Sequence, residues 1–314
     1  AAVVIVCAHA AIPESRDTHA GRHIDLLGAG LASVSLALST WALIEAGPRG
    51  WTDPAVLGAG LLALVAMGAF VWRMMHTHDP LVPPALFRNR TFTVVNLQTV
   101  LIYAALGVSF FLVSYQLQVA AGWSATEAGL ALIPATTLML LLSPSSGELA
   151  QRIGPRLQLT VGPLLAAAGL LLLSRIGEDA SWIADVFPGA VVFGLGLVTF
   201  VAPLTATVMA AADPDHVSVA SGVNNAIARA AGLTALSVIP VISGLTAAAD
   251  PADVTHSFRI ALIITAFVAA ASAPLALFGL ERRVDAPCTS RRIHCPVDGT
   301  PLQATPSPAE LRPR

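Results

Sequence analysis

Eight long runs of residues without Asp, Glu, Lys or Arg constrain this chain more than any other feature. They cover residues 26–44, 55–72, 93–112, 128–147, 157–174, 186–209, 230–245 and 260–280. A bilayer core is about 30 Å thick and needs about 20 apolar residues of helix, because a helix satisfies its own backbone in lipid. Eight buried runs in a soluble protein would need a core larger than one domain forms. The runs therefore predict an all-α integral membrane protein, in which the seventh span is short unless Arg229 joins it.

The composition of the 314 residues excludes several classes of function. Apolar residues make up 55% and charged residues 11%, and the net charge is −2, so no basic surface is large enough to bind nucleic acid. No His, Asp or Glu cluster falls at membrane depth, which argues against an intramembrane enzyme. Cys288, His294 and Cys295 supply only three ligands at irregular spacing, and we expect no metal site there.

The distribution of arginine predicts the orientation of the spans. Short loops rich in basic residues stay in the cytoplasm. With the loop before residue 26 inside, the outer loops hold only Arg49, Arg175 and Arg259, and the other basic residues of the loops and tail lie inside. Trp41, Trp51, Trp123 and Trp182 then lie near outer ends, as is typical of membrane interfaces. We expect a multi-pass protein of the plasma membrane with its C-terminus in the cytoplasm.

The two ends of the chain differ from its middle. Residues 1–11 are apolar but too few to span, and they lack the basic region of a signal peptide. We interpret them as the remnant of a preceding transmembrane helix, so that the chain is a fragment. The tail 281–314 is rich in proline and has no apolar periodicity, which predicts a disordered segment.

Motifs in a fixed order carry a family resemblance. They are PES at 13–15, HIDLLG at 23–28, EAGPRGW at 45–51, DPLVPPALFRNRTF at 79–92, YQLQ at 115–118, GWSATEAG at 122–129 and SGVNN at 221–225. In this order and spacing they resemble the 14-helix drug:proton antiporters of the major facilitator superfamily. The resemblance implies that 12–72 are an inner loop and an inserted transmembrane hairpin, that 73–280 form the C-terminal six-helix bundle, and that the N-terminal half is missing.

One further stretch is similar to a superfamily signature with a role in gating. The sequence from Gly147 to Arg156, GELAQRIGPR, resembles G-x-x-x-D-R-x-G-R-R but carries Gln151 at the acidic position and Pro155 at a basic one. Gly147 and Gly154 would allow close approach and a sharp turn in an inner loop. Arg152 would meet a carboxylate or a helix C-terminus across the interface of the two halves in one access state and lose it in the other. Arg152 and Arg156 are the residues of this stretch that we expect to act in gating. The alternative is that both arginines only hold the loop in the cytoplasm.

Polar residues within the apolar runs are the candidates for a substrate cavity, because such side chains usually face a cavity or a neighbouring helix. At 100° per residue, Asn96, Tyr103, Ser114 and Gln118 fall in one broad sector of the third span. Hydrogen bonds between helices are the alternative reading of that stripe. Asn224, Asn225 and Arg229 approach the seventh span, and Arg229 could instead be an anchor at the inner interface.

The resemblance implies export of drugs or secondary metabolites by proton antiport, through alternating access and without a cofactor. No span carries a carboxylate at its middle, so the proton-carrying group would lie in the missing half, and we expect the fragment alone not to transport. The implied partners are the lipid bilayer, protons, an amphipathic small molecule and the N-terminal half. Another transporter of the superfamily, such as a nutrient or metabolite importer, is the alternative.

Overall fold

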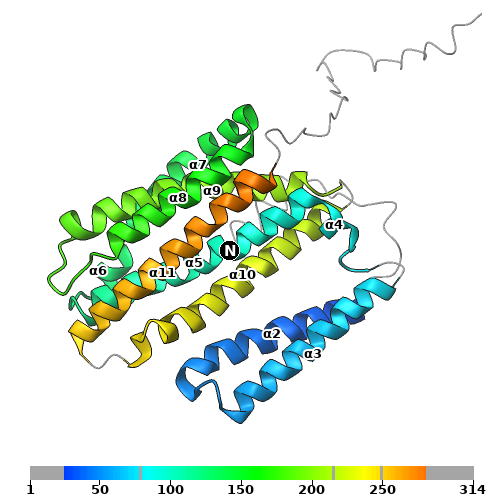
Figure 1. Cartoon of the computed structure of the whole chain (residues 1–314), viewed down its shortest axis with the longest axis horizontal. Coiled ribbons are helices and arrows are strands. Elements are labelled where there is room, and N and C mark those ends of the chain that lie inside the picture. The colour runs from blue at the N-terminus through cyan, green and yellow to red at the C-terminus, as the bar shows by residue number, and fades with distance from the viewer. Residues whose placement is uncertain (1–24, 78–79, 214–215, 248–249, 281–314) are drawn as a thin grey trace, which may run out of the picture. The chain divides into compact units, whose positions relative to one another are not determined.

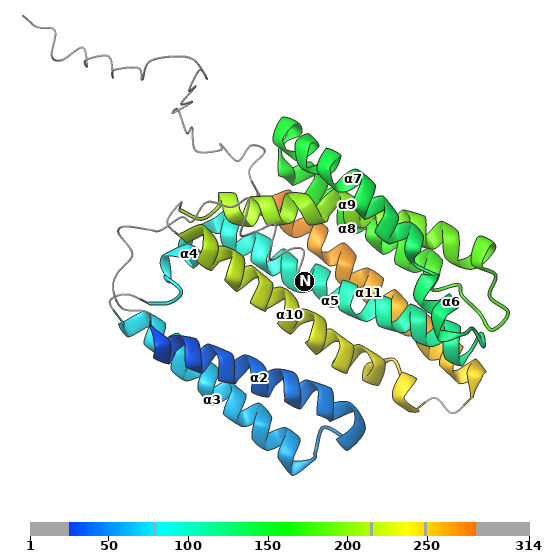
Figure 2. The same cartoon turned by 180° about the vertical axis from the view of Figure 1, so that it is seen from behind.

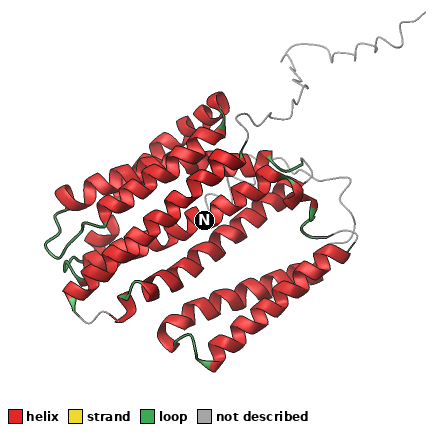
Figure 3. Ribbon diagram, in the orientation of Figure 1, coloured by secondary structure: helices red, strands yellow, loops and turns green. Residues whose placement is uncertain are grey.

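Helices joined by short loops make up the part of the chain that the structure, a computed structural model, describes: residues 25–77, 80–213, 216–247 and 250–280 (Figures 1 and 3). The predicted helix remnant at 1–11, the tail 281–314 and its Cys288, His294 and Cys295 lie outside these residues. The long helices are α2 (Leu26–Arg49), α3 (Pro54–His76), α5 (Arg90–Val119), α7 (Ile133–Ile153), α8 (Pro155–Leu173), α9 (Phe187–Ala210), α10 (Val217–Ile242) and α11 (Pro251–Gly279). Shorter elements are α4 (Ala85–Arg88), α6 (Ala125–Leu130), a π-helical turn η1 (Trp182–Val186) and a 3₁₀ turn η3 (Leu245–Ala247).

Each of the eight predicted apolar runs lies mainly in helix. In the described residues, eight helical segments are long and apolar enough to cross a membrane, which confirms the multi-pass helical class. Side-chain caps explain several helix starts: Asp53, Asn89 and Asp250 each accept a hydrogen bond from a backbone amide of the first turn that follows. Ser124 and Glu127 form a reciprocal capping box at the start of α6.

The structure corrects three of the predicted spans. One is the run 260–280, because α11 begins at Pro251 and includes Arg259, which was expected in an outer loop. The run 128–147 is not one continuous helix, because α6 ends at Leu130 and α7 begins at Ile133. Pro134 explains the break, since it has no amide hydrogen to bond to the preceding turn. The run 230–245 is also wrong at its start: α10 begins at Val217, so Arg229 lies within the helix. A span assigned from charge-free residues ends at a charged residue, but the backbone hydrogen bonds of the helix continue through it.

The helices from α5 to α11 share one large apolar core, and the α2–α3 hairpin has a small one of its own. The large core contains Phe92, Phe193, Phe200 and Phe258, all almost fully buried. The hairpin core is made of Ala42, Ala46, Val56 and Ala59. In space the neighbours run in the order α7, α9, α8, α11, α5 and α10, and the hairpin follows with α2 against α10 (Figures 1 and 2).

Small residues let α8 and α9 pack at very short range. A Cβ atom placed on Gly196 would lie 2.4 Å from the backbone nitrogen of Ala166. No real side chain fits at that distance. Glycine in α9 therefore sets how closely these two helices approach, as is common between membrane helices.

Candidate functional site

A polar contact fixes α10 against α5. Asn224 Nδ2 donates to Thr99 Oγ1 at 2.8 Å and to Asn96 Oδ1 at 3.1 Å, and all three side chains are buried. Asn96 in turn donates to the backbone oxygen of Phe92. The structure thus brings together Asn96 and Asn224, two of the cavity candidates, in a hydrogen bond between helices.

A close backbone contact lies farther along the same two helices. A Cβ atom on Gly107 would lie 2.8 Å from Gly232 Cα, and one on Gly232 would lie 3.4 Å from the backbone oxygen of Tyr103. Helices α5 and α10 therefore run in the same direction with a constant offset in number. Tyr103, half-buried, lies at the level between the asparagine contact and the glycine contact.

A pocket of about 780 Å³ lies between the α2–α3 hairpin and α10. Asn225 and Arg229 both line it from α10, and both side chains are exposed in it. Its polar groups include the hydroxyls of Ser39, Thr40 and Thr234, and apolar side chains of α2 and α3 form most of the remaining wall. The volume is in the range of small-molecule sites, about 300 to 1,000 Å³.

Hydrogen bonds between elements hold the walls of this pocket. Ser35 Oγ, fully buried, donates to the backbone oxygen of Ala63 at 3.0 Å and joins α2 to α3. Ser237 Oγ donates to the backbone oxygen of Leu43 at 2.6 Å and joins α10 to α2. Side-chain hydroxyls thus connect all three helices that line the pocket, so the hairpin is part of the site.

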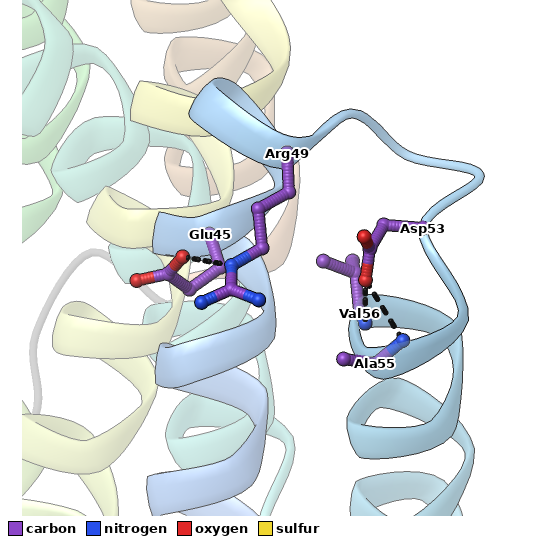
Figure 4. Close-up of polar contacts among 5 residues, drawn as sticks. All are labelled: Glu45, Arg49, Asp53, Ala55 and Val56. Carbon is purple, nitrogen blue, oxygen red and sulfur yellow. Dashed lines mark hydrogen bonds and ion pairs between the residues drawn. The ribbon is translucent and has the colours of Figure 1, made fainter.

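Charged groups at the end of the hairpin nearest Trp51 have partners of their own (Figure 4). Arg49 Nε lies 2.6 Å from Glu45 Oε2, and its guanidinium carbon lies 5.7 Å from the centre of the Trp41 ring. Asp53 accepts hydrogen bonds from the amides of Ala55 and Val56 and caps α3. Trp51, between these groups in the chain, lines the pocket.

The stripe expected on α5 does not converge on this pocket. Ser114 is half-buried, and Gln118 is exposed and donates to the backbone oxygen of Ser114. Ser114 lies about five helical turns beyond Asn96, and Gln118 lies about four turns beyond Tyr103, toward the end of α5. Asn96 and Tyr103 instead face the region of α10.

The stretch from Gly147 to Arg156 is mostly helix rather than loop, which corrects the expected inner loop. Helix α7 continues through Gly147, Gln151 and Arg152 to Ile153. Only Gly154, with φ of 85°, forms the sharp turn before α8. A Cβ atom on Gly147 would meet nothing within 4 Å, so no close approach occurs at that position in this structure.

The two arginines of that stretch have different partners. Arg152 forms a 2.6 Å ion pair with Glu148 one turn earlier, and both side chains are largely exposed. The Arg156 guanidinium donates to the backbone oxygen of Leu277, and Arg90 donates to that of Phe278 at 3.0 Å. Arg90 and Arg156 therefore both hold the C-terminal end of α11, where helix carbonyls carry negative partial charge.

Three buried glutamines and one buried carboxylate were not among the candidates. The side-chain amides of Gln98, Gln116 and Gln158 donate across helices, to the Leu159 backbone, the Thr255 hydroxyl and Ser146 respectively. Asp25 caps α2 and lies 2.9 Å from Arg73 Nε of α3. The sequence signal that could have identified these glutamines is their polar character in or beside an apolar run. That signal does not reveal their hydrogen-bond partners.

Comparison with known proteins agrees with this architecture. Residues 24–236 match the Major Facilitator Superfamily. The chain is 32% identical to the lincomycin resistance protein of Streptomyces lincolnensis over 274 residues, which is 86% of this chain and 56% of that protein. It is 30% identical to the tetracenomycin C resistance and export protein of Streptomyces glaucescens over 232 residues, 74% of this chain and 43% of that protein.

A third relative, the puromycin resistance protein of Streptomyces alboniger, is 27% identical over 296 residues, 88% of this chain and 57% of that protein. The chain thus spans about half the length of these relatives. Because the family match covers most of the eight apolar helices, this chain belongs to the Major Facilitator Superfamily.

Proposed function

We propose that this chain is part of an exporter of amphipathic drugs or secondary metabolites. The observation that carries the proposal is the similarity, along most of the chain, to proteins named for antibiotic resistance or export. The pocket between the hairpin and α10 supports it, because an apolar wall with a few polar groups suits ligands of mixed character. The chain acts as a carrier and not as an enzyme, and it needs no cofactor.

In this proposal the eight helices are the C-terminal portion of a 14-helix drug:proton antiporter. The α2–α3 hairpin is the inserted pair, α5 to α11 form the C-terminal bundle, and a second bundle completes the transporter. The order of the motifs and the length of the relatives support this arrangement. Export is driven by protons through alternating access between the two bundles, and the titrating carboxylate belongs to the other bundle.

The ends of helices near Arg90, Arg152 and Arg156 form the inner gate. Two arginines already bind the carbonyl end of α11, and Arg152 pairs only with Glu148 in the residues that the structure describes. An exposed ion pair within one helix is weak, so Arg152 is free to exchange this partner for one in the opposite bundle. The arginine-rich ends and the C-terminus face the cytoplasm across the plasma membrane.

Resistance profiling tests the export function. Cells that express the full-length protein should survive higher concentrations of at least one amphipathic antibiotic than cells without it. A proton uncoupler should abolish the difference in drug accumulation, because the gradient drives export. Uptake of a nutrient without any change in drug sensitivity would instead identify an importer and overturn the proposal.

A further inference from the structure

Arg229 lies at the middle of α10, far from either end. At about 1.5 Å per residue, its Cα is about 18 Å from Val217 and about 20 Å from Ile242, the two ends of the helix. The contacts with α5 place it near the level of Tyr103, which is also deep within a 30-residue helix. Both distances are too long for the side chain to reach water at a helix end, which argues against the interfacial anchor.

The guanidinium of Arg229 has no protein partner in the described residues. The ion pairs there join Arg49 to Glu45, Arg73 to Asp25 and Arg152 to Glu148, all at helix ends. Arg90 and Arg156 bind helix carbonyls, but no side chain or carbonyl of the described residues accepts a hydrogen bond from Arg229. A charge at membrane depth is costly unless a counter-charge meets it.

The surroundings of Arg229 suit one class of counter-charge. The guanidinium lies at the wall of the 780 Å³ pocket, where Asn225 and Thr234 are its polar neighbours on α10. Leu36, Leu57 and Leu61 of the hairpin supply apolar surface. An inorganic anion would leave this apolar wall uncovered, whereas a neutral ligand would leave the guanidinium unpaired.

We propose that the pocket binds an amphipathic organic anion, whose acidic group pairs with Arg229 and whose apolar body lies against α2 and α3. The inference rests on the proposed export function, because it names the substrate class of the same site. Arg is suited to this task because its planar donors match carboxylate, sulfonate and phosphate groups in two-point contacts. The anion is either a free solute or the headgroup of a lipid.

Binding of a matched pair of dyes tests the charge preference. The full-length protein is placed in phosphatidylcholine nanodiscs and titrated with dansyl sulfonate, an anion, and with its uncharged sulfonamide, each followed by fluorescence. The wild type should bind the sulfonate about tenfold or more tightly than the sulfonamide, and Arg229→Gln should remove that difference. Arg229→Lys should keep most of it, because the charge remains.

Two controls separate the charge effect from damage to the fold. Arg175→Gln removes a positive charge from a loop outside the pocket, and this variant should bind both dyes like the wild type. Arg229→Gln should bind the sulfonamide with unchanged affinity, which shows that the pocket is intact. The inference would be overturned if the wild type and Arg229→Gln prefer the sulfonate over the sulfonamide to the same degree. A carboxylate elsewhere in the full-length protein that neutralises Arg229 would give that result.

The source of the anion and the export function are read separately. Nanodiscs containing phosphatidylglycerol should weaken sulfonate binding if a lipid headgroup occupies the site and should leave it unchanged if the ligand is a free solute; both results support an anion site. Arg229-dependent sulfonate binding in a protein that exports nothing from cells would refute only the export function. Drug export by a protein without the charge preference would refute only the anion site.

Discussion

At the scale of single residues, the arginines of this chain divide by their position along the helices. Several arginines near helix ends, among them Arg73 and Arg156, meet a carboxylate or a helix carbonyl. Arg229, at the centre of α10, lines a pocket instead. This central position, away from the helix ends, is why the proposed binding role falls on Arg229.

Asp25 is the residue whose protonation should affect stability most clearly. The backbone amide of Gly28 donates to its carboxylate and Arg73 lies beside it, and together they hold the pKa of Asp25 below its usual value despite its burial. A depressed pKa stabilises the fold fully above the unfolded-state value of about 3.9, and this stabilisation is lost as the pH falls through the folded-state value.

Asp25→Asn should therefore lower the melting temperature of the full-length protein in detergent at neutral pH, and the difference from wild type should shrink below about pH 4. Tryptophan fluorescence during heating measures it. Asp53→Asn is the matched control: Asp53 also caps a helix, but no ion pair involves it in the described residues, and asparagine caps almost as well. A pH-independent loss in Asp25→Asn would contradict the role of the charge.

Which residues are polar within apolar runs could be read from the sequence, but their partners could not. Asn96 and Asn224 were candidates for a cavity, and the structure pairs them between α5 and α10. The pairing depends on the rotation of each helix and on the close contact of Gly107 with Gly232, neither of which a single chain's hydropathy specifies. Arg229 and Asn225 do line a pocket, because no helix covers their side of α10 completely.

At the scale of helices, the number of apolar segments was predictable and their boundaries were less so. Charge-free runs reveal where lipid-compatible surface lies, and each of the eight runs is mainly helical. The start of α10 was missed because Asn224, Asn225 and Arg229 make its first half polar. The break before Pro134 could have been read from the missing amide of proline.

Close packing of α8 and α9 leads to a prediction at this scale. Gly196→Ala places a methyl group 2.4 Å from the Ala166 nitrogen, so the helices must separate, and we expect a loss of about 1 to 3 kcal/mol in the free energy of unfolding. Titration with a denaturing detergent, followed by circular dichroism, measures the loss.

Gly68→Ala on α3 makes the same chemical change in open space, where nothing lies within 4 Å of the new methyl group. It should be neutral or should stabilise the protein by up to about 1 kcal/mol, because alanine restricts the unfolded chain. Equal effects of the two substitutions would show that helix propensity, and not the contact between α8 and α9, determines the result.

For the protein as a whole, the path of the chain through the membrane depends on which helix ends share one side. Arg90 and Arg156 reach the same end of α11. Arg152 lies in the last turn of α7 and Arg156 in the first turn of α8, with the sharp turn at Gly154 between them. Trp51 follows the C-terminal end of α2, and Trp182 precedes the N-terminal end of α9. Both tryptophans therefore lie at the helix ends opposite to these arginines. The arrangement agrees with the distribution of arginine and tryptophan along the sequence, which predicted that the arginine-rich ends lie in the cytoplasm.

Cysteine labelling of the full-length protein in intact cells tests this most directly. In a variant whose own cysteines are replaced by serine, single cysteines at Arg88, Gln151 and Glu178, all exposed, report on the two sides. A membrane-impermeant maleimide should label Glu178→Cys in intact cells, and it should label Arg88→Cys and Gln151→Cys only after the membrane is opened. Labelling of Arg88→Cys and Gln151→Cys from opposite sides would contradict the proposed path of the helices through the membrane.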